Sequence, residues 1–232
     1  MTVADENVHP HVRSFVIRAG RMTKAQEQAL TELSPKYALE INELTPIDFN
    51  AAFGREAPLV VEVGFGMGKS FIEMAAHDPE RNYLGIEVHP PGVGACLMQI
   101  EEQGLHNVRV IRHDAYEIFR HCVAAQSIDI LQIFFPDPWP KARHHKRRLI
   151  NAEFIDLIRP LMKMGGEVRM ATDWQEYAEE MLALFSQAPG FVNTATDGGY
   201  IPRPQWRPLT KFEQRGERLG HGVWDLVFKR QD

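Results

Sequence analysis

The chain contains the stretch Leu59-Val60-Val61-Glu62-Val63-Gly64-Phe65-Gly66-Met67-Gly68, which decides its fold class. The first five residues form a mostly apolar run that is typical of a buried strand, and the three glycines after it mark a tight turn. Residues 70–77 then have the apolar pattern of a helix. A strand, a glycine turn and a helix in this order are typical of α/β sheets, in which ligands bind beyond the carboxyl ends of the strands.

The pattern continues on the carboxyl side of this stretch. We expect further strands over residues 82–88, 108–111, 128–135 and 167–171, separated by helices near residues 93–103, 115–125, 151–162 and 174–187. Strands that alternate with helices predict right-handed βαβ units and a parallel sheet covered on both faces. Strand signals return at residues 191–194 and 222–228. The sequence therefore predicts a doubly wound, Rossmann-like sheet.

Length and composition fit one globular domain of 232 residues, of which 44% are hydrophobic. We expect a basic N-terminal arm over residues 1–35 and a single domain over residues 36–232. The net charge of −5 argues against a histone-like binder, so any contact with nucleic acid must come from local patches. Cys96 and Cys122 lack metal-ligand spacing and imply a reducing compartment. With no secretory signal or long apolar run, we expect a cytoplasmic protein.

The glycine turn by itself is compatible with several kinds of ligand, and also with a structural turn that binds no ligand. A phosphate-binding P-loop needs four residues between its glycines, and the spacing from Gly64 to Gly68 leaves one too few. A dinucleotide turn has its third glycine one position later than Gly68. Glu87 follows about 20 residues after the turn, where an acid accepts hydrogen bonds from ribose hydroxyls. A nucleoside-containing ligand therefore fits better than a bare phosphate.

Acidic side chains around the turn favour a cationic ligand. Glu62 lies inside the predicted strand, and an unpaired buried charge is costly. S-adenosylmethionine carries an ammonium and a sulfonium and no phosphate, so it suits these acids better than a dinucleotide does. Asp114, after the third strand, would accept a hydrogen bond from an adenine amino group or cap the next helix. Both roles remain open for Asp114.

A second informative stretch is Phe134-Phe135-Pro136-Asp137-Pro138-Trp139-Pro140-Lys141, which follows the fourth strand. The prolines hold Asp137 in a stiff turn, where it serves either a ligand or the local backbone. Trp139 would stack on a base or cover the core. The cationic residues that follow suit phosphate groups, although charge runs are often solvated faces. Asp173, after the fifth strand, would contact substrate, cap a helix, or do both.

Five motifs together resemble the bacterial tRNA (guanine-N7)-methyltransferase family, over about residues 13–229. They are Glu62–Gly68, Phe135–Lys141, Arg143–Arg148, Thr172-Asp173-Trp174 and Thr210-Lys211-Phe212-Glu213. The resemblance implies a class I methyltransferase sheet, mostly parallel with an antiparallel last strand. It also implies that S-adenosyl-L-methionine methylates N7 of the guanine at position 46 in the tRNA variable loop. Departures at Phe134, Lys69 and Ala142 concern fine specificity, because no motif residue is lost.

The resemblance also assigns roles to residues. Its methyl-donor residues are Glu62, Gly64, Gly66, Gly68, Glu87, Asp114 and Asp137, and Asp137 is the catalytic candidate. Its substrate residues are Lys141, Asp173, Thr210, Lys211, Phe212 and Glu213. Its RNA contacts are Arg143, His144, His145, Lys146, Arg147 and Arg148, and we expect no metal site, since the two histidines lack other ligands at suitable spacing.

The chemistry of this reaction needs no base, because guanine N7 carries a lone pair and no proton. Catalysis would rest on in-line positioning of the two reactants and on a carboxylate that stabilises positive charge. Two alternatives are a methyltransferase for another substrate and an RNA-binding module with a vestigial donor pocket. Basic patches argue against the first, and the intact acids argue against the second. We expect tRNA as the partner, no membrane association, and a monomer or homodimer.

Overall fold

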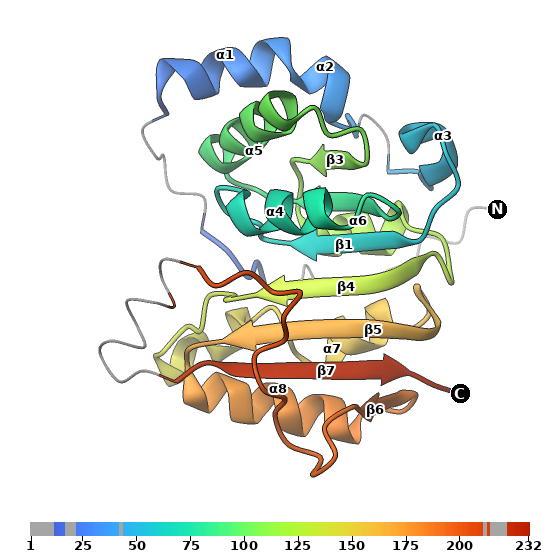
Figure 1. Ribbon diagram of the computed structural model, residues 1–232. Helices are drawn as coiled ribbons and strands as arrows, with labels where there is room; N and C mark the ends of the chain where they lie inside the picture. The colour runs from blue at the N-terminus through green and yellow to red at the C-terminus, as the bar shows by residue number, and fades with distance from the viewer. Residues whose placement is uncertain (1–11, 17–21, 42–43, 211–212, 214–221) are drawn as a thin grey trace, which may run out of the picture.

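The computed structural model describes residues 12–16, 22–41, 44–210, 213 and 222–232. Within them, the strands form one seven-stranded sheet in the order β3-β2-β1-β4-β5-β7-β6 (Figure 1). Strands β1 to β5 are parallel, and β7 is antiparallel to β5 and β6. This confirms the mostly parallel sheet with an antiparallel last strand. The strands are β1 Leu59–Val63, β2 Asn82–Ile86, β3 Val108–Ile111, β4 Ile128–Phe134, β5 Met162–Thr172, β6 Phe191–Asn193 and β7 Trp224–Arg230.

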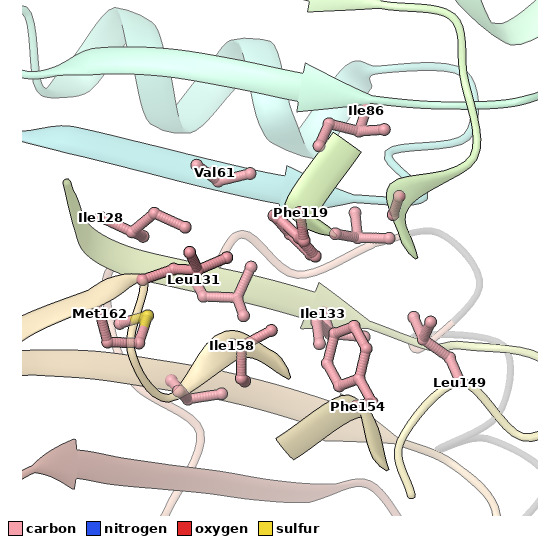
Figure 2. Close-up of a cluster of buried hydrophobic side chains, with 14 of the residues drawn as sticks. Val61, Ile86, Phe119, Ile128, Leu131, Ile133, Leu149, Phe154, Ile158 and Met162 are labelled. Atoms are coloured by element: carbon pink, nitrogen blue, oxygen red, sulfur yellow. The ribbon is translucent and has the colours of Figure 1, made fainter. Parts of the chain in front are cut away.

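Helices cover the sheet as two layers, because successive strand residues point to opposite faces. Val60 and Ile130 belong to one apolar cluster, together with side chains of α1, α4 and α5. Val61 and Leu131 belong to the other, together with side chains of α3, α6, α7 and α8 (Figure 2). The helices are α1 Lys24–Glu32, α2 Ser34–Tyr37, α3 Phe49–Phe53, α4 Lys69–His77, α5 Pro90–Gln103, α6 Ala115–His121, α7 Ala152–Ile158 and α8 Gln175–Gln187, with the 3₁₀ helix η1 Ala142–Arg147.

The strand order reverses between β1 and β4, which are neighbours although two strands separate them along the chain. A reversal of this kind opens a crevice beyond the carboxyl ends of the strands. The glycine turn follows β1 and the proline-rich turn follows β4, so the topology brings the two motifs to the same edge of the sheet (Figure 1).

Part of the expected N-terminal arm is a packed helix. Helix α1 begins with a capping box between Thr23 and Gln26, and its Ala29 is buried in the α4/α5 cluster. Gly94 of α5 allows this approach, because a Cβ at that position would lie 2.7 Å from the carbonyl oxygen of Gln26. The expectation that residues 1–35 stay outside the core is therefore wrong for α1. Its single buried residue left no clear periodicity in the sequence.

The fifth strand begins earlier than the expected residue 167, since β5 starts at Met162 and includes the pair Gly165-Gly166. The register of β4 against β5 shifts between Ile128, which pairs with Met162, and Ile130, which pairs with Glu167. The two glycines lie in the irregular part of β5 between these pairs. A Cβ at Gly166 would lie 2.9 Å from the carbonyl oxygen of Asp129, which explains a glycine inside the strand. Among the described helices, none has both the length and the apolar character to cross a membrane.

Candidate functional site

A cavity of about 220 Å³ lies at the carboxyl edge of the sheet, at the reversal of strand order. It is lined by residues that follow β1, β2, β3 and β4, and by two residues of the N-terminal segment. The lining includes Ser14, Phe15, Gly64, Glu87, Asp114, Phe135 and Asp137. Four of the seven predicted methyl-donor residues thus meet in one cavity.

The three glycines of the turn have different roles. All have positive φ, at 76° for Gly64, 58° for Gly66 and 81° for Gly68, a conformation that other residues adopt only with strain. Gly64 lines the cavity. Gly68 begins α4 against α5, because a Cβ there would lie 2.9 Å from the Cβ of Cys96. Gly66 and Gly68 therefore shape the turn, and the structure places only Gly64 in the cavity wall.

Glu87 joins the second strand to the glycine turn. Its Oε2 accepts a hydrogen bond from the amide of Gly66 at 2.9 Å, and its Oε1 accepts from the amides of Val88 and His89 at 2.7 and 3.0 Å. Each carboxylate oxygen has more than one lone pair, so capacity remains for a ligand hydroxyl. The side chain is oriented by backbone donors and lines the cavity.

Glu62 lies on β1 beneath the cavity rather than in its wall, with 3% of its surface exposed. Its Oε2 is buried and has no hydrogen-bond partner among the described residues. Burial, together with the charge of Glu87, raises the pKa of Glu62 to about 8. A buried carboxyl without a donor next to a ligand cavity fits a cationic group such as an amino-acid ammonium.

Asp114 has one of the two roles that the sequence left open, because it caps a helix. Its Oδ1 accepts from the amide of Tyr116 at 3.0 Å and caps α6, which confirms the helix-cap prediction. The same side chain belongs to the cavity lining. The cap orients Asp114 at the cavity wall, where it remains a candidate for an adenine contact.

The turn after β4 has a strained backbone. Phe135 and Trp139 have φ values of 51° and 46°, which are uncommon for residues with a side chain. The amide of Phe135 donates to the carbonyl of Ala171 at 2.8 Å and so fixes the start of the turn on β5. Asp137 lines the cavity, and its carboxylate accepts no hydrogen bond within the described part of the chain. Of the two roles that the sequence left open for Asp137, the bond to the local backbone is not observed among the described residues, and contact with a ligand stays a prediction.

Trp139 connects the turn to the N-terminal segment. Its Nε1 donates to the carbonyl of Ser14 at 3.0 Å, and its ring lies 5.9 Å from the His144 ring and 5.1 Å from the Arg147 guanidinium. This contact brings Ser14 and Phe15 into the cavity wall. Sequence reasoning missed both residues, because no local pattern marks a segment that reaches the site through one long-range hydrogen bond.

The cationic segment divides into exposed and buried members. Arg143 and Lys146 are exposed on η1, and Arg147 is partly exposed. Burial, with the positive charges of Arg143 and Arg147, lowers the pKa of His144, so the positive charge near neutral pH comes from the arginines and the lysine. His145 lies 3.5 Å from Glu176 of α8.

Arg148 requires a correction to the predicted RNA contacts. It is 2% exposed, and its guanidinium donates to the carbonyl of Pro138 at 2.9 Å and to Glu176 at 3.3 Å, with a further ion pair to Glu180. These contacts tie the proline-rich turn to α8 and leave the side chain out of reach of RNA. The charge run itself did not separate Arg148 from its neighbours, because its partners come from a distant helix.

Glu213 also differs from its predicted role. It is 3% exposed and pairs with Arg207 at 2.6 Å, while Arg207 forms two hydrogen bonds to Asp225 at 2.7 and 2.8 Å. Thr210 and Glu213 cap each other through the Thr210 amide at 3.0 Å and the Glu213 amide at 3.1 Å. In this arrangement Glu213 holds the motif in place rather than facing substrate. Lys211 and Phe212 lie outside the described residues.

Lys141 and Asp173 are exposed at the same edge of the sheet but do not line the cavity. The expected helix cap by Asp173 is wrong, because α8 begins after Trp174, whose amide donates to Thr172 Oγ1 at 3.2 Å. Asp173 is therefore open to solvent. Within the described ranges, no cluster of three or more acidic, histidine or cysteine side chains forms a metal site.

Comparison with known proteins gives the family. A family model described as "Putative methyltransferase" matches residues 56–226. The tRNA (guanine-N(7)-)-methyltransferase of Aeromonas hydrophila subsp. hydrophila is 57% identical over 219 residues, which cover 94% of this chain and 92% of that protein. The protein with the same name from Pseudomonas aeruginosa is 58% identical over 221 residues, covering 95% and 90%.

Solved structures agree on the fold. The 16S rRNA methyltransferase KamB has a TM-score of 0.58 at 14% identity, covering 84% of this chain and 98% of that one. The aminoglycoside resistance methyltransferase NpmB1 has a TM-score of 0.53 at 16% identity, covering 79% and 92%. At such identities the likeness concerns the fold alone. From the family model and the near full-length relatives, the chain belongs to the bacterial tRNA (guanine-N7)-methyltransferase family.

Proposed function

We propose that this protein transfers the methyl group of S-adenosyl-L-methionine to N7 of the guanine at position 46, in the variable loop of tRNA. The observation that carries this proposal is the cavity at the reversal of strand order, which has Glu87 and Asp114 in its wall and an unbonded Asp137 at its rim. The relatives named above bear the name of the same reaction.

The methyl donor fits the acidic side chains of the cavity. Glu62 would face its ammonium, Glu87 its ribose hydroxyls and Asp114 its adenine amino group, while Gly64 allows its close approach. When bound, the donor supplies an electrophilic methyl group on a sulfonium. Lined by the apolar Phe15 and Phe134 as well, the cavity shields part of the donor from water.

Methyl transfer makes a modest demand on the protein, because guanine N7 attacks with a lone pair and no proton is removed first. The remaining tasks are to align N7 with the methyl carbon and to stabilise the positive charge that develops on the guanine. The Asp137 carboxylate lies on a strained, proline-stiffened turn and accepts no hydrogen bond from the described residues, so it is available for the second task.

The RNA would bind at the rim of the cavity. Arg143, Lys146 and Arg147 would contact phosphates, and Lys141, Asp173 and Thr210 would contact the guanine or its neighbours. A role for Lys211 and Phe212 in binding the substrate rests on the family resemblance alone. We further propose a cytoplasmic protein that acts as a monomer or homodimer.

The test is transfer of a labelled methyl group from S-adenosylmethionine to unmodified tRNA transcripts with guanine or adenine at position 46. We expect incorporation only into the guanine transcript, with strand cleavage at that site under the alkaline conditions that open N7-methylguanine. Incorporation into both transcripts would refute the position, and a different methylated atom would refute the reaction. Donor binding without incorporation would favour a vestigial pocket on an RNA-binding module.

A further inference from the structure

Two buried acceptors lie side by side beneath the methyl-donor cavity. Glu62 on β1 and Gln132 on β4 are direct partners in the parallel ladder, and they are 3% and 1% exposed. Both side chains lie on the α4/α5 side of the sheet, since Val60 and Ile130, two residues earlier, pack there. Glu62 Oε2 and Gln132 Oε1 are both buried without a hydrogen-bond partner among the described residues.

The neighbours of this pair supply no donor to either oxygen. The amide nitrogen of Gln132 faces the weak acceptor Met74 Sδ at 3.8 Å. On one side, Gly85 of β2 has no side chain, and the ring of Phe65 fills its place. On the other side, Arg169 of β5 pairs with Glu167 at 2.7 Å and lies 4.1 Å from the Trp206 ring. Neither oxygen therefore has a donor among the described residues, and the two side chains belong to neighbouring positions of the sheet.

One proton resolves this arrangement, because a protonated carboxyl becomes a hydrogen-bond donor. We propose that Gln132 positions the Glu62 carboxyl by accepting a hydrogen bond from its protonated form, and that the ammonium of the methyl donor replaces this proton on binding. The exchange is balanced in charge: one cation enters and one proton leaves for solvent. It avoids leaving an unpaired carboxylate buried when the cavity is empty.

The surrounding charges favour the protonated form in the free protein. Burial and the carboxylate of Glu87 raise the pKa of Glu62 to about 8. Burial also raises the pKa of the Cys96 thiol on α5, which therefore stays neutral beside the pair. Arg169, the partner of Gln132 on β5, is already paired with Glu167. This inference rests on the proposed methyl-donor site.

The experiment is calorimetric titration with S-adenosylhomocysteine, which keeps the ammonium and lacks the methyl group, in buffers of different ionisation enthalpy. For the wild-type protein we expect most of one proton to be released at pH 7 and little at pH 9, because the pKa of Glu62 in the free protein is about 8. Gln132→Met keeps the size and removes the acceptor, so it should lower the release at pH 7. Gln103→Met, on the exposed end of α5, should leave it unchanged.

A second measurement does not depend on the donor. In the folded protein Glu62 keeps its proton up to about pH 8, whereas in the unfolded chain it loses it near its ordinary value of 4.5. As the pH rises between these values, the folding equilibrium constant of the wild type, relative to that of Glu62→Gln, should fall by up to tenfold for each pH unit. Gln132→Met removes the acceptor for the Glu62 proton, so the pH range over which stability falls should become narrower.

The outcomes separate the two proposals. Binding without proton release at pH 7 would overturn the exchange and leave the donor site intact. No binding by the wild type would overturn the donor site, and the exchange with it. A stability difference that does not vary with pH would overturn the hydrogen bond between Glu62 and Gln132, whatever the titration shows.

Discussion

The carboxylates around the cavity differ in how many backbone amides they accept hydrogen bonds from. Glu87 accepts from three amides and Asp114 from the amide of Tyr116, whereas Asp137 and Glu62 Oε2 accept no hydrogen bond from the described residues. The three amides fix the orientation of the Glu87 carboxylate at the cavity. Asp137 differs because it is exposed at the rim and free to meet a ligand.

For Asp137→Asn we expect turnover to fall by about 100-fold, because a preorganised group that stabilises developing charge typically contributes this much. Affinity for S-adenosylhomocysteine should change by less than about tenfold, because the other acids of the donor site are intact. Steady-state methyl transfer and calorimetry measure the two effects. The control is Asp156→Asn, on the exposed side of α7. Unchanged turnover in Asp137→Asn would exclude a catalytic role for Asp137.

At the scale of elements, buried arginines connect the turn after β4 to the rest of the site. Arg148 joins the turn to α8 through Pro138, Glu176 and Glu180. Arg207 lies 5.5 Å from the Phe135 ring and joins the Thr210–Glu213 motif to β7. Burial opposes the charge of the Arg207 guanidinium, but the hydrogen bonds and negative charges of Asp225 and Glu213 together outweigh burial and raise the pKa of Arg207. The site is thus held by ion pairs between distant elements.

Replacing Arg148 by alanine should lower the free energy of unfolding by about 3 kcal/mol. This is the low end for breaking a buried ion pair, because the carboxylates left behind on α8 reach solvent. The matched substitution Arg143→Ala, on exposed η1, should change stability by less than about 0.5 kcal/mol. Urea unfolding compares the two variants. Equal stabilities would show that Arg148 does not anchor the turn.

Arg207→Lys should also destabilise the protein, by about 3–5 kcal/mol, because lysine keeps the charge but cannot form the two parallel hydrogen bonds to Asp225. Arg203→Lys, in the same loop but exposed, should change stability by less than about 1 kcal/mol. Thermal unfolding of both variants checks this. A wild-type melting temperature for Arg207→Lys would refute the anchoring role of this cluster.

For the whole molecule, the net charge of −5 means that RNA binding depends on where the exposed cations lie. Arg143, Lys146 and Arg147 lie on η1, directly after the turn that carries Asp137, so an acidic protein has a local positive patch next to this turn. Phosphate contacts of this kind release counterions and make binding depend on salt. The acidic remainder of the surface would discourage other orientations of the RNA.

Replacing Arg143, Lys146 and Arg147 together by alanine should weaken tRNA binding and flatten its salt dependence. Each lost phosphate contact should reduce the slope of log K against log salt by about 0.7–0.9. The control replaces Lys163 and Lys229, which lie toward the opposite edge of the sheet, and should leave the slope unchanged. Filter binding between 50 and 200 mM salt, a range suited to such slopes, measures both. Equal slopes for both variants would show that Arg143, Lys146 and Arg147 are solvated side chains that do not contact phosphates.

Local sequence patterns were sufficient to predict much of the fold. The apolar run before Gly64, the alternation of strands with helices and the family motifs predicted the parallel sheet and its antiparallel last strand. They also predicted that Asp114 could cap a helix, as it does for α6. These features depend on neighbours within a few positions along the chain, and such information is present in the sequence itself.

Only the tertiary structure decided which charged side chains are available to ligands. Arg148 and Glu213 belong to motifs that read as exposed, yet their partners Glu180 and Arg207 bury them. Ser14 enters the cavity wall through Trp139, and Glu62 meets Gln132 because β1 and β4 are neighbours in the sheet. The physical reason is that the availability of a charge depends on which distant groups desolvate or pair with it. The sequence by itself determined the elements and the motifs, and folding determined which of their side chains face a ligand.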